Sequence, residues 1–280
     1  NDAGSTVQIS AFAPSVADGE QYVWLGWDGI GSGSYSGMDN PALITMNGPI
    51  TENAAWRHEY YLTVTSAYDS PSPRSAWFEA GTEITASVTS PWPGSVGTRY
   101  VCTGWTGTGS VTSSGTTTST IFTISEPSSI NWNWKTQHYL TMLTNFGTVS
   151  PSSGWYDKGS LVRISAEAPQ EVQGKGFAWY GWVGIGEISY SGLDNPANIT
   201  INSPINETAH WKIVPELTIV VSNETIARCD RVVVYGKTLP AIPDGEVEIT
   251  YTFPNGTQVI HTVQTDDEGG YNDTLLLGES

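Results

Sequence analysis

The stretch that decides the fold is YVWLGWDGIG (Tyr22–Gly31), which returns as RYVCTGWTGTG (Arg99–Gly109) and FAWYGWVGIG (Phe177–Gly186). The Trp after its shared Gly recurs at intervals of 78 and 77 residues, at Trp27, Trp105 and Trp182. A second Trp keeps the same intervals, at Trp56, Trp134 and Trp211. Landmarks that share one period are typical of tandem repeats, so each copy is expected to fold as one small unit.

The residues around these landmarks alternate with period two, as half-buried β-strands do. In the third copy, Ile199 and Ile201 are expected to point inward and Asn198 toward solvent. The Gly-Trp stretch is apolar at successive positions, which predicts Trp24 on one face of its strand, Trp27 on the other, and cover on both faces. No stretch shows 3.6-residue periodicity over three turns, so the chain is predicted to be all-β.

The period divides the chain into three repeat modules and a remainder. The predicted boundaries are 1–58, 59–136 and 137–214 for the modules and 215–280 for the last block. About three residues separate each closing Trp from the next opening strand, too few for a flexible linker. Asn1–Gly4 aligns with the interior of the later copies, so we expect the first module to lack its opening strand and the chain to be a piece of a longer protein.

The block from Pro215 has a different pattern. DRVVVYGKTL (Asp230–Leu239) and VEITYT (Val247–Thr252) are strand-like, and Pro254–Thr257 predicts a hairpin turn. The block looks like an immunoglobulin-like sandwich, for which about seven strands are expected. Only 66 residues remain for it, so we expect a C-terminally truncated domain.

Charge narrows the range of partners. The chain has 11 Lys and Arg against 28 Asp and Glu, which gives a net charge of −17. A strongly negative chain without a basic cluster is a poor binder of nucleic acid and of anionic membranes. No apolar run approaches the ~18 residues of a membrane helix, so no membrane span is expected in this segment.

Sequons and cysteines bear on location. N-glycan acceptors are predicted at five N-x-S/T sequons, Asn198, Asn206, Asn223, Asn255 and Asn272. Together with the charge, they favour an extracellular or cell-surface protein. A disulfide between Cys102 and Cys229 is not favoured, because the two lie in different predicted domains and a bridge needs Cα atoms within about 7 Å.

The repeat unit resembles the InlB B-repeat family of bacterial surface proteins and its divergent relatives in bacteria and archaea. The resemblance rests on the aromatic-x-x-x-Gly-Trp strand, on the closing strand that ends in Trp56, and on the W-[YF]-x-x-G element at Trp77–Gly81 and Trp155–Gly159. It implies small β modules, β-grasp-like or small sandwiches, in adhesins and S-layer-type proteins. An inserted SYSGxDNPA loop departs from typical members. The last block looks like the Ig-like domains of archaeal and bacterial surface proteins, and the sequons point to an archaeal glycoprotein.

The sequence shows no assembled set of catalytic groups. None of the four His belongs to an H-E-x-x-H motif, and no G-x-S-x-G elbow occurs. The Gly-Trp-x-Gly-x-Gly motif precedes a strand rather than the helix that a phosphate cradle needs. We therefore expect no enzyme activity, catalytic residue, cofactor or metal site. Calcium at Asp266, Asp267 and Glu268 stays open as an alternative, because this turn resembles a calcium loop in charge but not in spacing.

Aromatic residues divide into core and surface candidates. Small β modules need bulky side chains to bury enough area, so the six repeat-locked Trp are expected to form structural core, at Trp27, Trp56, Trp105, Trp134, Trp182 and Trp211. Cys102 replaces Trp24 and Trp179 of the other copies, which indicates a small core residue. Trp92, between two prolines, is the candidate for an exposed contact with a sugar.

These patterns favour a structural extracellular protein. We expect a rod of tandem β modules that self-associates with identical chains into a sheath, S-layer or filament. One alternative is an adhesin or carbohydrate-binding segment that binds cell-surface glycans, which predicts an exposed aromatic cleft. The other is a spacer in a secreted multi-domain enzyme, which predicts a monomer.

Overall fold

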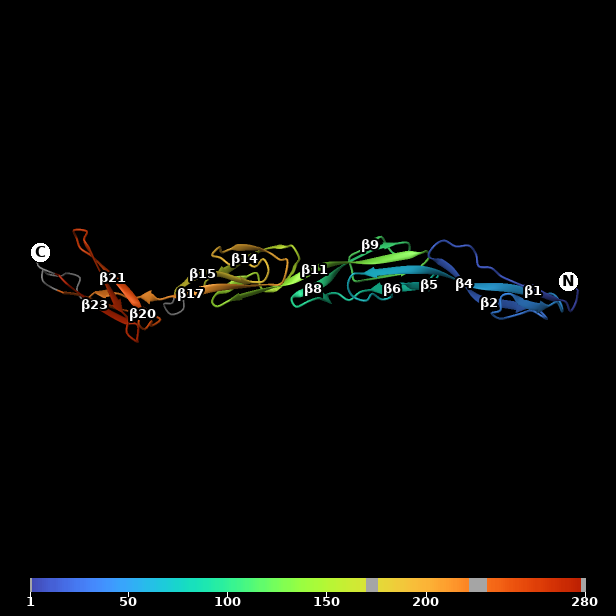
Figure 1. Cartoon of the computed structure of the whole chain (residues 1–280), viewed down its shortest axis with the longest axis horizontal. Coiled ribbons are helices and arrows are strands. Elements are labelled where there is room, and N and C mark those ends of the chain that lie inside the picture. The colour runs from blue at the N-terminus through green and yellow to red at the C-terminus, as the bar shows by residue number, and fades with distance from the viewer. Residues whose placement is uncertain (1, 170–175, 222–230, 278–280) are drawn as a thin grey trace. The chain divides into compact units, whose positions relative to one another are not determined.

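A computed structural model of the chain describes residues 2–169, 176–221 and 231–277, and it confirms the predicted all-β class (Figure 1). The chain divides into two compact units, Asn1–Gln137 and His138–Ser280. We call residues 1–58, 59–136 and 137–214 copies 1, 2 and 3, and residues 215–280 the C-terminal block. The first unit contains copies 1 and 2, and the second contains copy 3 and the C-terminal block.

Copy 3 shows a full repeat, in which two sheets enclose one core. In the first sheet, β17 pairs antiparallel with β15 and parallel with the second half of β11, and β13 lies beside β11. The strands of this sheet are β11 (Ser128–Thr144), β13 (Gly154–Asp157), β15 (Gly176–Ile185) and β17 (Ile205–Val214). The second sheet consists of β12 (Thr148–Ser150), β14 (Leu161–Glu167) and β16 (Ala197–Thr200).

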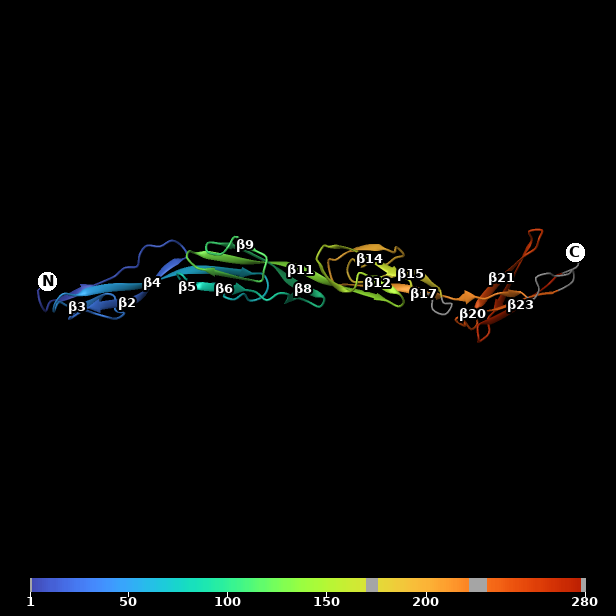
Figure 2. The same ribbon diagram turned by 180° about the vertical axis from the view of Figure 1, so that it is seen from behind.

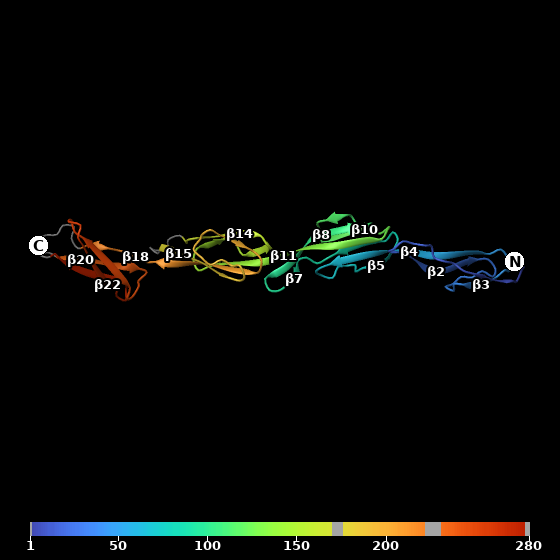
Figure 3. The ribbon, with the colours of Figure 1, turned by 45° about the horizontal axis from the view of Figure 1, so that its top comes forward.

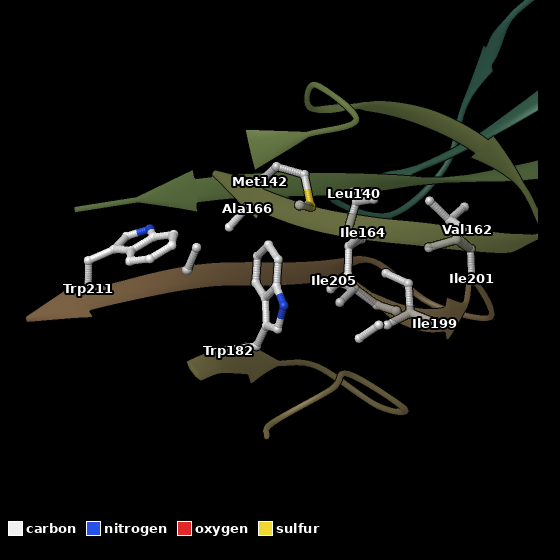
Figure 4. Packing of buried hydrophobic residues seen from close by; sticks show 12 residues of the cluster. Leu140, Met142, Val162, Ile164, Ala166, Trp182, Ile199, Ile201, Ile205 and Trp211 are labelled. Carbon is white, nitrogen blue, oxygen red and sulfur yellow. The ribbon is translucent and has the colours of Figure 1, made fainter. Parts of the chain in front are cut away.

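The core of copy 3 lies between these sheets. Figure 4 shows side chains of this cluster, among them Trp182, Trp211, Met142, Ala166 and Ile164. Side chains from both sheets meet in one hydrophobic cluster, as in a sandwich. Of the two alternatives for the module, the small sandwich therefore describes this structure.

Copy 2 has the same arrangement of two sheets as copy 3, but its strands differ in length. Its first sheet joins the second half of β4 to the first half of β11 in parallel, and β8 lies on the other side of β11. The remaining strands are short, and β6 and β10 pair with each other in the facing sheet. Figure 3 labels β5, β7, β8 and β10. The strands are β5 (Ala76–Glu79), β6 (Glu83–Ser87), β7 (Trp92–Pro93), β8 (Thr98–Thr108), β9 (Ser114–Gly115) and β10 (Ser119–Thr123).

Within residues 2–58, the described part of copy 1, four strands begin. β2 pairs antiparallel with β4, and β1 pairs antiparallel with β3. Their bounds are β1 (Thr6–Ile9), β2 (Glu20–Ile30), β3 (Ala42–Thr45) and β4 (Thr51–Ser66).

β4 and β11 each belong to two copies, which corrects the expectation of a three-residue spacer between copies. β4 pairs with β2 as far as Tyr60 and with β11 from Leu62 onward, so residues 57–59 lie inside the strand. Residues 135–137 likewise lie inside β11. The reason is local, because neither stretch contains a Gly or Pro that would interrupt the strand.

The Gly-Trp motif is a β-bulge, and it overturns the prediction that Trp24 and Trp27 face opposite sides. Trp24 pairs with Trp56 and Gly26 with the preceding Ala55, which leaves Leu25 as an extra residue in β2. An extra residue resets the alternation of side chains. The Trp24 and Trp27 rings consequently share a face, with centroids 5.5 Å apart, while Leu25 is 48% exposed. The strand is therefore covered on one face, not two.

The C-terminal block has two sheets around its own core. β20 lies between β23 on one side and the short β18 and β19 on the other, and β21 and β22 form the predicted hairpin (Figure 2). The bounds are β18 (Glu216–Leu217), β19 (Val220–Val221), β20 (Arg231–Leu239), β21 (Glu246–Thr252), β22 (Gln258–Gln264) and β23 (Gly270–Leu276). Val234, Ile249 and Tyr271 contribute to the shared core. The immunoglobulin-like assignment stays a prediction.

We predict that Gly181→Ala destabilises copy 3 by more than about 2 kcal/mol, because the backbone strain at a positive φ adds to a steric clash of the new Cβ. Gly181 has a φ of 122°, and a Cβ there would lie 2.8 Å from the Gly192 carbonyl oxygen. Gly159→Ala is the matched control, since its φ is 85° but a Cβ there meets nothing within 4 Å, and it is expected to cost about 1 kcal/mol. Hydrogen exchange of the β15 and β17 amides measures both, and equal losses would contradict the packing role of Gly181.

Candidate functional site

The most elaborate local structure is a loop that folds back on the Gly-Trp strand in copies 1 and 3. We call it the anchored loop and define it as 34–41 in copy 1 and 189–196 in copy 3. In copy 1, the Trp27 amide donates to the Gly37 carbonyl at 2.8 Å and the Gly37 amide donates back at 3.1 Å. The Trp24 indole N–H donates to the Met38 carbonyl at 2.9 Å. The bulge thus turns Trp24 toward the loop that it holds.

Copy 3 reproduces the same contacts. The Trp182 amide lies 2.8 Å from the Gly192 carbonyl oxygen, and the Trp179 indole N–H donates to the Leu193 carbonyl at 2.7 Å. The side chain of Asn195 exchanges two hydrogen bonds with the backbone of Ala166, at 2.7 and 2.9 Å. That pair fixes the loop to β14 in the facing sheet.

A buried glutamate anchors the loop from below. The Glu207 side chain is fully buried, and its Oε1 accepts the Tyr190 amide at 2.7 Å. Its Oε2 is buried without a hydrogen-bond partner. Burial raises the pKa of the Glu207 carboxyl, and the bond from Tyr190 offsets only part of this. Glu52 makes the equivalent bond in copy 1, to the Tyr35 amide at 2.8 Å.

Our sequence analysis missed this glutamate. A signal was present, because Glu52 and Glu207 occupy inward positions of the closing strand in the two copies that carry the loop, whereas copy 2 has Ile130 there. The aspartates of the anchored loop, in its Asp-Asn-Pro turn, play no such part. Asp39 and Asp194 are exposed, and it is their backbone amides that donate, each to a tyrosine hydroxyl at 3.1 Å.

A polar network in the C-terminal block brings together residues that the sequence did not link. The Tyr251 hydroxyl and the His261 Nδ1 each lie 2.7 Å from Oδ2 of Asp273. Burial alone would raise the pKa of Asp273, but these two hydrogen bonds, a third from the Thr274 amide and the electrostatic interaction with His261 together hold that pKa below the usual range. Burial and the Asp273 carboxylate together raise the pKa of Tyr251. The network ties the β21–β22 hairpin to β23.

The acidic turn at 266–268 forms its own internal structure. Asp266 Oδ1 accepts the Glu268 amide at 2.9 Å and the Gly270 amide at 2.7 Å, as a turn-forming Asp does. The Glu268 carboxylate lies 3.4 Å from the Lys237 ammonium. Within residues 2–169, 176–221 and 231–277, no group of three or more His, Cys, Asp or Glu side chains could hold a metal ion.

The repeat-locked Trp lie at two levels of burial. Trp27, Trp105, Trp182 and Trp211 are buried, whereas Trp56 and Trp134 are half-buried. Cys102 is buried in the core of copy 2, where burial raises the pKa of its thiol. Cys229 lies outside the described residues.

Trp92, the candidate for a sugar contact, is half-buried in β7 and pairs with Tyr100 of β8. It therefore lies on a strand rather than on a free loop. His58 and His210 are half-buried, and the His58 ring stacks on Tyr22 with ring centroids 4.4 Å apart.

The predicted glycan acceptors lie on the surface wherever the structure describes them. Asn198 on β16, Asn206 on β17, Asn255 in the β21–β22 turn and Asn272 on β23 are all exposed. Asn223 lies outside the described residues. Each exposed acceptor is therefore accessible as far as this chain is concerned.

Comparison of the chain with family models, with curated proteins and with solved structures found no match. The resemblance to the InlB B-repeat family stays a prediction. Among the described residues, no helix is long and apolar enough to cross a membrane.

We predict that Glu207→Gln stabilises copy 3 at pH 7 but not at pH 3. The raised pKa means that the folded state holds the Glu207 proton more tightly than the unfolded state does. The free energy of unfolding therefore falls as pH rises above the ordinary carboxyl pKa of about 4.3. Gln keeps an acceptor for Tyr190 and carries no charge. Hydrogen exchange of β17 amides at both pH values tests this, with the exposed Glu187→Gln as control. A variant that matched the parent at both pH values would contradict the burial argument.

Proposed function

We propose that this protein is a structural component of an extracellular surface, in which its β-sandwich copies associate with identical chains into a sheath, S-layer or filament. The observation that carries the proposal is the continuity of β4. Its first half completes copy 1 and its second half opens copy 2, so the two copies share a hydrogen-bonded strand instead of a linker. A continuous strand leaves no flexible linker between the two copies, which suits a building element.

The use of polar side chains supports the same proposal. Glu207 and Asn195 hold a loop, and Asp273 holds a hairpin. Each of these groups is engaged with its own fold rather than arranged around an open space. This pattern favours a scaffold over a reaction centre.

Surface chemistry supports an extracellular location. The net charge of −17 keeps chains soluble and limits non-specific contacts. The four described sequon asparagines are exposed. The adhesin alternative predicted an exposed Trp92, and the half-buried position of that ring gives it less support.

We predict that the purified chain forms ordered assemblies with identical chains. Negative-stain electron microscopy and sedimentation over a range of protein concentrations would show filaments or sheets that grow with concentration. Parallel samples in calcium chloride and in chelator test the calcium alternative. A chain that stays monomeric under every condition would contradict self-assembly and favour the spacer alternative.

We predict N-glycans on the exposed sequons of the chain recovered from the cells that make it. Glycopeptide mass spectrometry would find occupied Asn198, Asn206, Asn255 and Asn272, and Thr200→Ala would remove the glycan at Asn198 alone, because Thr200 completes that sequon. Four unmodified asparagines would contradict extracellular display.

A further inference from the structure

An exposed tyrosine lies directly beside one of the predicted glycan acceptors. In the C-terminal block, Tyr235 of β20 lies opposite Asn272 of β23 in the antiparallel register. Side chains that lie opposite each other in an antiparallel pair leave the sheet on the same face, with Cβ atoms about 5 Å apart. Tyr235 is 47% exposed and Asn272 is exposed, whereas the adjacent Val234 and Tyr271 point into the core. The two side chains therefore share the outer face of the sheet.

This tyrosine lies in the middle of its sheet. β20 pairs with β23 on one side and with β19 on the other, where Val220 lies opposite Tyr235. Val220 is 45% exposed, so it belongs to the same outer face. Val220, Tyr235 and Asn272 thus form one row across three strands. The exposure of the Tyr235 ring is that of a sheet face and not that of a free strand edge.

A hollow of about 320 Å³ lies along this row. Tyr235 and Asn272 both line it, and so do Val220, Lys237 and Asp266. Sites for small molecules commonly measure about 300–1,000 Å³, so this hollow suits a small occupant such as a sugar ring.

The lining of the hollow matches the two kinds of surface that a sugar ring has. The Tyr235 ring provides a flat apolar surface for the C–H face of a pyranose. The Lys237 ammonium can donate hydrogen bonds to sugar hydroxyls, and the Asp266 carboxylate can accept them. Gly270 lies opposite Lys237, and a Cβ there would lie 2.7 Å from Oδ2 of Asp266. The missing side chain at Gly270 therefore keeps this part of the hollow open.

The strand register distinguishes Asn272 from two other described acceptors. Asn198 lies opposite Arg163, and Asn206 lies opposite Ile185. Asn272, in contrast, lies opposite an aromatic ring. The first sugar of an N-glycan is bonded to the side-chain amide of its Asn, so at Asn272 it must emerge beside that ring, whatever the sugar is.

We propose that the hollow beside Tyr235 seats the first sugar of an N-glycan on Asn272. The apolar face of the sugar packs on the Tyr235 ring, and its hydroxyls face Lys237 and Asp266. The seated sugar covers an exposed aromatic side chain and adds a contact across the β20–β23 pair. This inference rests on the extracellular glycosylation proposed above and adds to it the non-covalent seat.

A double-mutant cycle tests the contact in the whole chain, purified from the cells that make it. Tyr235→Ser removes the ring, and Thr274→Ala removes the sequon but leaves Asn272 in place. Tyr235→Ser should speed hydrogen exchange of the β20 and β23 amides about fivefold more in the glycosylated chain than in the Thr274→Ala chain, because the contact between ring and sugar exists only in the former. Equal effects in the two chains would overturn the proposal.

The acceptor in the β21–β22 turn provides the matched control. Thr257→Ala removes the sequon of Asn255, which lies outside the β20–β23 pair. Tyr235→Ser should have the same effect in the Thr257→Ala chain as in the parent. If loss of either glycan reduced the effect of Tyr235→Ser equally, glycosylation would act in a general way, and the seat would be wrong.

Nuclear Overhauser effects observe the seat directly. Cross-peaks between the Tyr235 ring protons and the first sugar on Asn272 are expected, and their absence in a glycosylated chain would overturn the proposal. An unmodified Asn272 in a chain with an occupied Asn198 would overturn this inference alone, whereas four unmodified acceptors would also contradict extracellular display. If Tyr235→Ser abolished self-assembly of the parent chain, the ring would be a contact between copies and the seat would be wrong.

Discussion

A left-handed glycine in the middle of a strand is the constraint on which each repeat depends. Gly26, Gly104 and Gly181 have φ values of 112°, 119° and 122°, which only glycine adopts without strain. In copies 1 and 3 the register shift before this glycine moves two Trp onto one face. In all three copies a Cβ at the glycine would lie within 3 Å of a loop carbonyl oxygen. The bulge, the pair of Trp side chains and the loop contact therefore all depend on this one glycine.

Copy 2 shows which residues vary together. It has Cys102 where the other copies have the loop-holding Trp, and Ile130 where they have the loop-holding Glu. Its loop is also different in sequence and contacts the Gly-Trp strand through Gly115. The short Cys side chain cannot reach a loop carbonyl as the Trp indole does. A buried Glu carboxylate that accepts no hydrogen bond from a loop amide would destabilise the fold. The three differences are therefore parts of one change.

The shared strands link the completion of one copy to the start of the next. Each repeat needs a parallel strand beside its closing strand, and in copies 2 and 3 the preceding strand continues into that position. These parallel pairings lie within each copy, and it is the continuous strand that joins one copy to the next.

The sequence by itself determined the repeat period, the all-β class, the inward position of Ile199 and Ile201, and the β21–β22 hairpin, because these depend on local alternation and turn chemistry. Tertiary structure alone decided that Trp24 and Trp27 share a face, that β4 serves two copies, and that Glu207 is buried beneath a loop. A bulge is defined by the register of the partner strand, and a parallel pairing joins residues more than sixty positions apart. Local sequence patterns do not indicate which distant strand will pair with a given strand.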